Sequence, residues 1–204
     1  MLGHLLQPNG SFRACWRAAQ RSMWRAFWAN VSSSAAKGLP TVTKLALLQR
    51  AVVPLLDFRC SRWPPQQQIA AEVDRLQRKM AAVSIRLPRI PGEPVEAYVR
   101  RRGRMVAAHC RQAGLWSHRW FHRTVAWRDH LERPRNARSW ASKTLHYMDH
   151  DWFCRRRALF GRAACTAGRT GTRTFPGCVH TRWHDGVQYA QEILQIPGGK
   201  ETGK

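Results

Sequence analysis

The stretch from Thr41 to Leu87 repeats apolar side chains with the period of an α-helix. The repeat is interrupted near Pro54, because a proline inside a helix removes a hydrogen bond and clashes with the preceding turn. The first series comprises Leu45, Leu48, Val52 and Leu55, and the second comprises Ile69, Val73, Leu76, Met80, Val83 and Leu87. We therefore expect two amphipathic helices that meet at a proline-rich corner, with residues 57–63 extended between them.

The second of these helices is predicted to have a basic exterior. Its cations lie away from the apolar seam, so that one face packs on protein while the other meets a polyanion or water. These cations are Arg75, Arg78, Lys79 and Arg86. The pattern predicts a helical scaffold with a positively charged surface.

Arginines and tryptophans share one face of an earlier predicted helix, which runs from a Ser11 cap to about Asn30. Its core stripe comprises Phe12, Trp16, Ala19, Met23 and Phe27. The other stripe comprises Arg13, Arg17, Arg21, Trp24 and Trp28, with Arg25 beside it. Guanidinium groups hold phosphates and indoles stack on bases, so this second stripe is predicted to contact nucleic acid. The alternative is that Trp24 and Trp28 only pack beneath neighbouring helices.

Two breaks frame the middle of the chain. Residues 32–40 form a predicted loop, after which Thr41 or Thr43 caps the next helix. Residues 88–94 are the second break and the predicted subdomain boundary, and the helix that follows begins at Pro94 and ends at Gly114. Its predicted apolar side is Val95, Val99, Val106 and Cys110, and its basic side, also a predicted nucleic-acid contact, is Arg100, Arg101, Arg102 and Arg104.

Three further helices are expected, at about 117–133, 139–160 and 185–196. In the first of these, Pro134 ends the helix. The predicted inward residues are Trp120, Thr124, Trp127 and Leu131, and the outward ones are Arg119, His122 and Arg123.

The predicted fold is an all-α, basic bundle of about six helices, with a short N-terminal hairpin. Residues 91–160 form its basic, Trp-rich helical region, and residues 161–204 form an irregular Gly/Thr/Arg-rich tail with one short helix.

The most informative feature of the composition is its large positive charge. The chain has 35 Lys and Arg against 12 Asp and Glu, a net charge of +23, and ten tryptophans. Such a charge repels itself unless a polyanion or an acidic partner shares the surface, and Arg offers planar contacts to phosphates and bases. Nucleic acid is therefore the expected partner.

The sequence contains few features that indicate the cellular compartment of the protein. The six cysteines include no C-x-x-C pair, so neither a disulfide framework nor a standard zinc site is indicated, and a reducing compartment is expected. No apolar run approaches the ~18 residues that span a bilayer, so no membrane partner is expected. We expect a nuclear or cytoplasmic protein; the alternative is mitochondrial, because no acidic residue precedes Asp57 and presequences are Arg-rich and acid-poor.

The order of the first segments resembles a known family. A short helix running into Val53-Pro54, the segment DFRCSRW and a helix with LQRKM resemble the region after the palm in reverse transcriptases of non-LTR (LINE-type) retrotransposons. Leu2-Gly3-His4 with Asn9-Gly10 resembles the hairpin that closes the palm, with Asn9 in place of the commoner Asp. The resemblance implies that residues 1–90 are a thumb-like helical region that grips a template-primer duplex, and that the chain starts where the palm would end.

No constellation for catalysis is found in the sequence. Polymerase chemistry needs neighbouring carboxylates that hold two metal ions, whereas the aspartates here are isolated: Asp57, Asp74, Asp129, Asp149, Asp151 and Asp185. We therefore expect no enzymatic activity and no cofactor. His146, His150 and Cys154 could place two or three metal ligands on one helix face, but no second pair of ligands accompanies them. A knuckle-like group of Cys165, Cys178, His180 and His184 has no standard spacing, so no metal site is assigned.

The predicted function is a non-catalytic fragment that grips RNA or an RNA/DNA duplex without sequence specificity. The predicted contacts are Arg13, Arg17, Arg21, Trp24, Arg25, Trp28, Arg75, Arg78, Lys79, Arg100, Arg101, Arg102 and Arg104. The alternative is a basic structural subunit of a ribonucleoprotein particle, with a mitochondrial one included. A third interpretation is that the chain is a decayed fragment of a retroelement and has no selected function.

Overall fold

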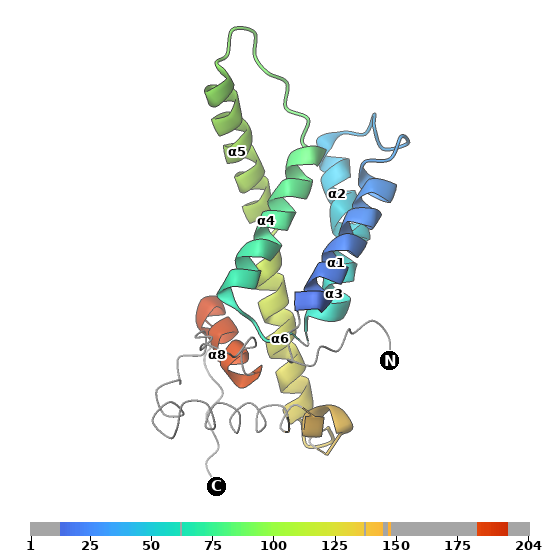
Figure 1. The fold of residues 1–204 in the computed structure, drawn as a ribbon, viewed down its shortest axis with the longest axis vertical. Helices are drawn as coiled ribbons and strands as arrows, with labels where there is room; N and C mark the ends of the chain where they lie inside the picture. The colour runs from blue at the N-terminus through green and yellow to red at the C-terminus, as the bar shows by residue number, and fades with distance from the viewer. Residues whose placement is uncertain (1–12, 62, 137, 145–146, 148–182, 196–204) are drawn as a thin grey trace. The chain divides into compact units, whose positions relative to one another are not determined.

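The computed structural model describes residues 13–61, 63–136, 138–144, 147 and 183–195, and these residues form helices and turns without a strand (Figure 1). The helices are α1 (Arg13–Ala26), a π-helical turn η1 (Phe27–Val31), α2 (Thr41–Ala51), α3 (Val53–Cys60), α4 (Gln67–Ser84), α5 (Val95–Gln112), α6 (Trp116–Glu132) and α8 (Trp183–Leu194). The all-α prediction is confirmed.

The chain divides into two compact units. The first consists of residues 1–15, 59–69 and 120–204, and the second of residues 16–58 and 70–119. The predicted break at 88–94 is a non-helical connection between α4 and α5, and both of its ends belong to the second unit. The division into regions 1–90, 91–160 and 161–204 stays a prediction.

The core stripe predicted for the first helix is buried in the second unit. Trp16 is 1% exposed, and Ala19, Met23 and Phe27 are fully buried. The Trp16 indole donates a hydrogen bond from Nε1 to Oε2 of Glu72 at 2.8 Å, so the buried ring also satisfies its polar atom. Ser11 and Phe12 lie outside the described residues. For the residues that are described, the predicted core face is confirmed.

The corner after α2 differs from the prediction. Residues 57–60 continue the helix α3, so the expected extended segment is wrong over that range. Pro54 is the second residue of α3, and a proline is tolerated in the first turn because its missing N–H has no helical acceptor there. The predicted Thr41 or Thr43 cap is also wrong: Pro40 occupies the cap position and no side chain caps α2.

The buried seam of α4 follows the prediction through Met80 and then departs from it. Ile69, Val73, Leu76 and Met80 are buried, but Val83 is 40% exposed. Four residues after Met80, Ser84 takes the buried position instead, and its hydroxyl donates to the Met80 carbonyl at 3.0 Å. The last turn of α4 then packs against α5 through a cluster of Ala81, Ile85, Val106 and Cys110.

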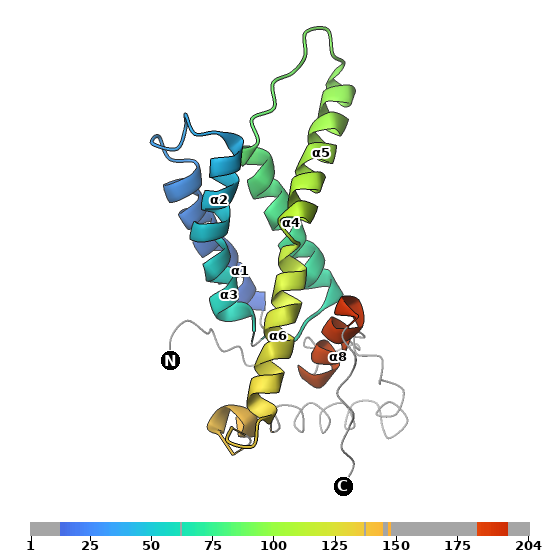
Figure 2. The same cartoon turned by 180° about the vertical axis from the view of Figure 1, so that it is seen from behind.

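Only the second half of α5 is buried on its apolar side. Val106 and Cys110 are in the core, whereas Val95 and Val99 are 57% and 58% exposed, so the predicted apolar face is wrong for the first two turns. The reason is geometric: the N-terminal end of α5 lies apart from α4 in both views (Figures 1 and 2). The helix ends near Gly114, whose φ of 81° suits glycine, as predicted.

In the first unit, aromatic rings of α6 pack on the proline-rich corner and on α8. The Trp120 ring meets Trp63 edge-on at 6.3 Å, and Phe121 meets Tyr189 at 5.6 Å. Trp120, Thr124 and Leu131 are buried as predicted, while Trp127 is only half-buried. The helix ends at Glu132, two residues before Pro134. The predicted helix at 185–196 is confirmed as α8, with its start shifted to Trp183.

Several predictions fall outside the described part of the chain. These are the N-terminal hairpin, most of the predicted helix at 139–160 and the predicted irregular tail apart from residues 183–195. Residues 139–144 and 147 of that predicted helix are described, and residues 140–144 and 147 are helical.

Candidate nucleic-acid interface

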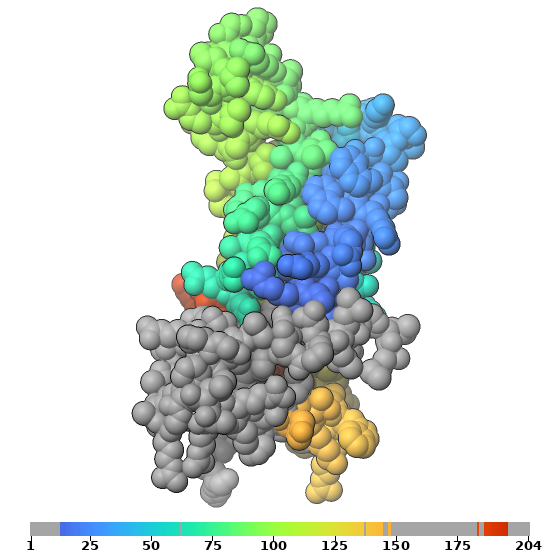
Figure 3. Space-filling model, viewed as in Figure 1, coloured from blue at the N-terminus to red at the C-terminus, as the bar shows by residue number. Residues whose placement is uncertain are grey.

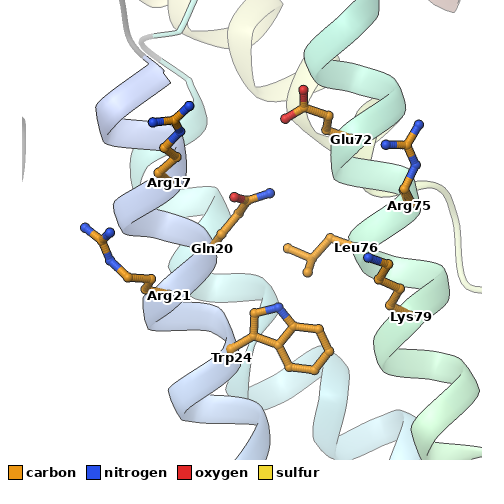
Figure 4. A pocket seen from close by; sticks show the side chains of 8 residues that line it. All are labelled: Arg17, Gln20, Arg21, Trp24, Glu72, Arg75, Leu76 and Lys79. Atoms are coloured by element: carbon orange, nitrogen blue, oxygen red, sulfur yellow. The ribbon is translucent and has the colours of Figure 1, made fainter.

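A groove of about 440 Å³ lies between α1 and α4, entirely within the second unit. The two helices are side by side on the face shown in Figure 3, and Figure 4 shows the side chains that line the groove, of which Gln20, Trp24 and Leu76 point into the space between the helices. The groove is lined by Arg17, Gln20, Arg21 and Trp24 from α1 and by Glu72, Arg75, Leu76 and Lys79 from α4. Two helices that are distant in the sequence therefore build one site.

Four cations stand along the two walls. Arg17 and Arg21 are one helical turn apart on α1, and Arg75 and Lys79 are one turn apart on α4, because residues i and i+4 share a helix face. All four side chains belong to exposed residues. The sequence predicted each of them as a nucleic-acid contact but did not predict that the two pairs line one groove.

Two apolar side chains line the groove, of which Trp24 is half-buried and Leu76 is buried. Trp24 and Leu76 point into the space between the helices (Figure 4). The Trp24 ring meets the buried Phe27 edge-on at 5.4 Å and stacks on Trp28 at 5.8 Å with an interplanar angle of 19°. Because Trp28 is itself 53% exposed, this aromatic pair runs from the core to the surface.

One carboxylate offsets part of the positive charge. Glu72 lines the groove and accepts the 2.8 Å hydrogen bond from the Trp16 indole, which fixes its position. Gln20 adds an amide that can both donate and accept. Sequence reasoning missed both residues; the available signal was their position one turn from Trp16, Trp24 and Leu76 on the same helix faces.

The remaining predicted contacts on these two helices lie outside the groove. Arg13, Arg25 and Arg78 are exposed and do not line it. Trp28 does not line it either but stacks on a residue that does.

The arginine run on α5 is divided between surface and structure. Arg100 and Arg104 are exposed. Arg101 donates to Glu93 from Nε at 2.9 Å and to the Pro88 carbonyl at 3.0 Å, and Arg102 donates to the Ala82 carbonyl. The hydrogen bond from Arg101 lowers the pKa of Glu93. Arg101 and Arg102 therefore tie α5 to the 88–93 turn and to the end of α4.

Three of the aspartates considered for catalysis are engaged with protein groups. Asp57 receives a forked contact from Arg119, with Nε at 2.7 Å from Oδ1. Asp74 accepts hydrogen bonds from Ser117, and Asp129 accepts from Arg128. Asp149, Asp151 and the Asp185 side chain lie outside the described residues.

The described ranges contain no group of three or more His, Cys, Asp or Glu side chains arranged to hold a metal ion. The two sets considered from the sequence fall outside what the structure describes: His146 and His150 with Cys154, and Cys165 and Cys178 with His180 and the His184 side chain. Among the helices that are described, none combines the length and the hydropathy needed to cross a bilayer.

Comparisons with known proteins identify no related protein. No family model matches the chain, and searches of curated proteins and of solved structures find no significant match. The resemblance to the thumb of a non-LTR reverse transcriptase therefore stays a prediction.

Proposed function

We propose that this protein binds nucleic acid through the α1–α4 groove without sequence specificity. The observation that carries the proposal is that Arg17 and Arg21 of α1 line the same groove as Arg75 and Lys79 of α4. Two rows of cations along one groove match a phosphate backbone, whose charge repeats along the strand. RNA or an RNA/DNA duplex is the proposed ligand, as a reverse transcriptase thumb would hold it.

Several features support this assignment beyond net charge. The groove side chains include an indole, and grooves that bind nucleic acid combine cations with aromatic rings. The contacts reach phosphates and ring faces, which every nucleotide has, so little sequence preference is expected.

A second candidate is a basic structural subunit of a ribonucleoprotein particle. The observation that favours it is the use of cations in ion pairs within the chain: Arg101 pairs with Glu93, Arg119 with Asp57 and Arg128 with Asp129. Such a subunit would contribute charge and packing without a groove of its own for the strand.

A salt titration on a matched pair of variants separates the two candidates. In the groove variant, Arg17, Arg21 and Arg75 are changed to Gln; in the control, the exposed Arg133, Arg135 and Arg138 are changed to Gln, which removes the same charge. If the groove contacts phosphates, log K of the groove variant should fall less steeply with log salt, by about 0.7 per lost contact on single strands. Equal slopes for the groove variant, the control and the unchanged protein would contradict the proposal.

A further inference from the structure

We infer that the α1–α4 groove takes a single strand of RNA or DNA, with one nucleobase against Trp24 and the neighbouring phosphates on the two walls. This inference rests on the proposed function and decides which form of nucleic acid the groove accepts.

The distribution of chemistry within the groove carries the inference. The cations Arg17, Arg21, Arg75 and Lys79 are exposed, whereas the other four lining residues are half-buried or buried. Those four are Gln20, Trp24, Glu72 and Leu76. A nucleotide has the same division, with a charged phosphate at one end and a flat apolar ring with polar edges at the other.

Two polar side chains of the groove can recognise the edge of a nucleobase. Glu72 and Gln20 line the groove, and both are half-buried. Carboxylates accept hydrogen bonds from the amino groups of bases, and Gln20 can donate or accept at a base edge. The negative charge of Glu72 disfavours a phosphate beside it, so the phosphates are expected on the exposed cations.

The size of the groove suits a single nucleotide. A volume of about 440 Å³ lies within the usual range for sites that hold one small ligand. A duplex keeps its ring faces stacked on each other and presents only its backbone and groove edges. It can reach the exposed cations of the walls but not the ring of Trp24.

Trp24 is held ready for stacking. Its contacts with Phe27 and Trp28, at 5.4 and 5.8 Å, orient the indole before any ligand arrives. A ring that is already ordered loses little conformational freedom on binding, so more of the stacking energy contributes to affinity.

The experiment compares a labelled 12-nucleotide RNA with the same strand annealed to its complement, by fluorescence anisotropy on the full chain. The unchanged protein should bind the single strand more tightly. Trp24→Leu should weaken single-strand binding by about five- to 150-fold, the usual effect of losing one stacked base, and change duplex binding by less than about twofold. The matched control is Trp140→Leu, because Trp140 is 86% exposed and belongs to the first unit.

A second measurement covers the case in which Trp24→Leu does not fold. With 2-aminopurine at the central position of the single strand, the fluorescence of that base should be quenched when it stacks on the indole of the unchanged protein. Trp24→Phe, which keeps a ring against Phe27, should retain part of the affinity.

The outcomes separate this inference from the proposed function. Equal or tighter duplex binding, with no effect of Trp24→Leu on the single strand and no quenching, would overturn the single-strand inference. If the Arg17, Arg21 and Arg75 variant still lost affinity for both ligands, the proposed nucleic-acid groove would stand. No loss in that variant would overturn both.

Discussion

The carboxylate of Asp74 on α4 holds the start of α6 through Ser117: Oδ1 accepts the backbone N–H at 2.9 Å and Oδ2 accepts the hydroxyl at 2.8 Å. One turn further along α4, the Gln77 amide donates to the Gly114 carbonyl at 2.9 Å and accepts the Trp116 N–H at 3.1 Å. The first N–H groups of a helix have no partner inside it, so these two side chains satisfy donors that would otherwise be buried unpaired.

Replacing Asp74 by Ala should lower the free energy of unfolding by about 1–3 kcal/mol, because the cap is lost and the polar groups of the buried Ser117 lose their acceptor. Urea denaturation followed by circular dichroism measures the change. The matched control is Asp129→Ala, since Asp129 pairs with Arg128 at the surface and such pairs contribute about 0–1 kcal/mol. Equal losses in the two variants would show that the cap does not stabilise the turn.

Local periodicity predicted most of the helices, and long-range contacts account for what it missed. The cores of α1, α4 and α6 follow from apolar spacing, because a helix face is set by residues three and four apart. The capping of α6 depends on a residue 43 positions earlier, and the groove depends on α1 lying beside α4. No local pattern specifies either relationship.

The two residues that link α1 to α4 give a second prediction. Trp16 is 1% exposed and donates to Glu72, so Trp16→Ala should lower the free energy of unfolding by about 3 kcal/mol or more. Trp16→Phe keeps a ring and loses the hydrogen bond, and its effect should be smaller. Thermal melts of both variants beside Trp140→Ala, which should lie within about 0.5 kcal/mol of the unchanged protein, measure the difference. A Trp16→Ala protein as stable as Trp140→Ala would contradict the burial of this ring.

The buried thiol of Cys110 gives a prediction on pH. Burial raises the pKa of Cys110, so the folded protein holds the thiol proton more tightly than the unfolded chain does. Its contribution to stability is therefore complete below the pKa of an unfolded cysteine, about 8.5, and is lost as the pH rises through the higher folded value. As the pH rises from 7 to 10, the urea midpoint should fall less steeply for Cys110→Ala than for the unchanged protein. If the two proteins show the same dependence of the midpoint on pH, another group causes the loss of stability at alkaline pH.

The sequence alone does not tell which arginines of α5 remain on the surface and which bind other parts of the protein. Arg100, Arg101, Arg102 and Arg104 are alike in sequence, yet Arg101 and Arg102 bind protein acceptors while the other two are exposed. The difference depends on whether a carboxylate or carbonyl of another segment lies within reach. In the same way, the sequence places Trp24 and Trp28 on one stripe, but the edge-on contact of Trp24 with the buried Phe27 depends on how the rings pack in the fold.

Two helical glycines should respond to alanine in opposite directions. At Gly186 in α8, a Cβ atom would lie 2.8 Å from the backbone nitrogen of Pro65 and 3.0 Å from the carbonyl carbon of Pro64. At Gly103 in α5, a Cβ atom would meet nothing within 4 Å. Alanine is the better helix former, so Gly103→Ala should raise the free energy of unfolding by about 0.5–1 kcal/mol. Gly186→Ala should lower it by about 1–3 kcal/mol, because the backbone of the proline-rich corner must move. Urea denaturation of the two variants side by side measures both changes, and a stabilised Gly186→Ala protein would show that α8 does not pack against Pro64 and Pro65.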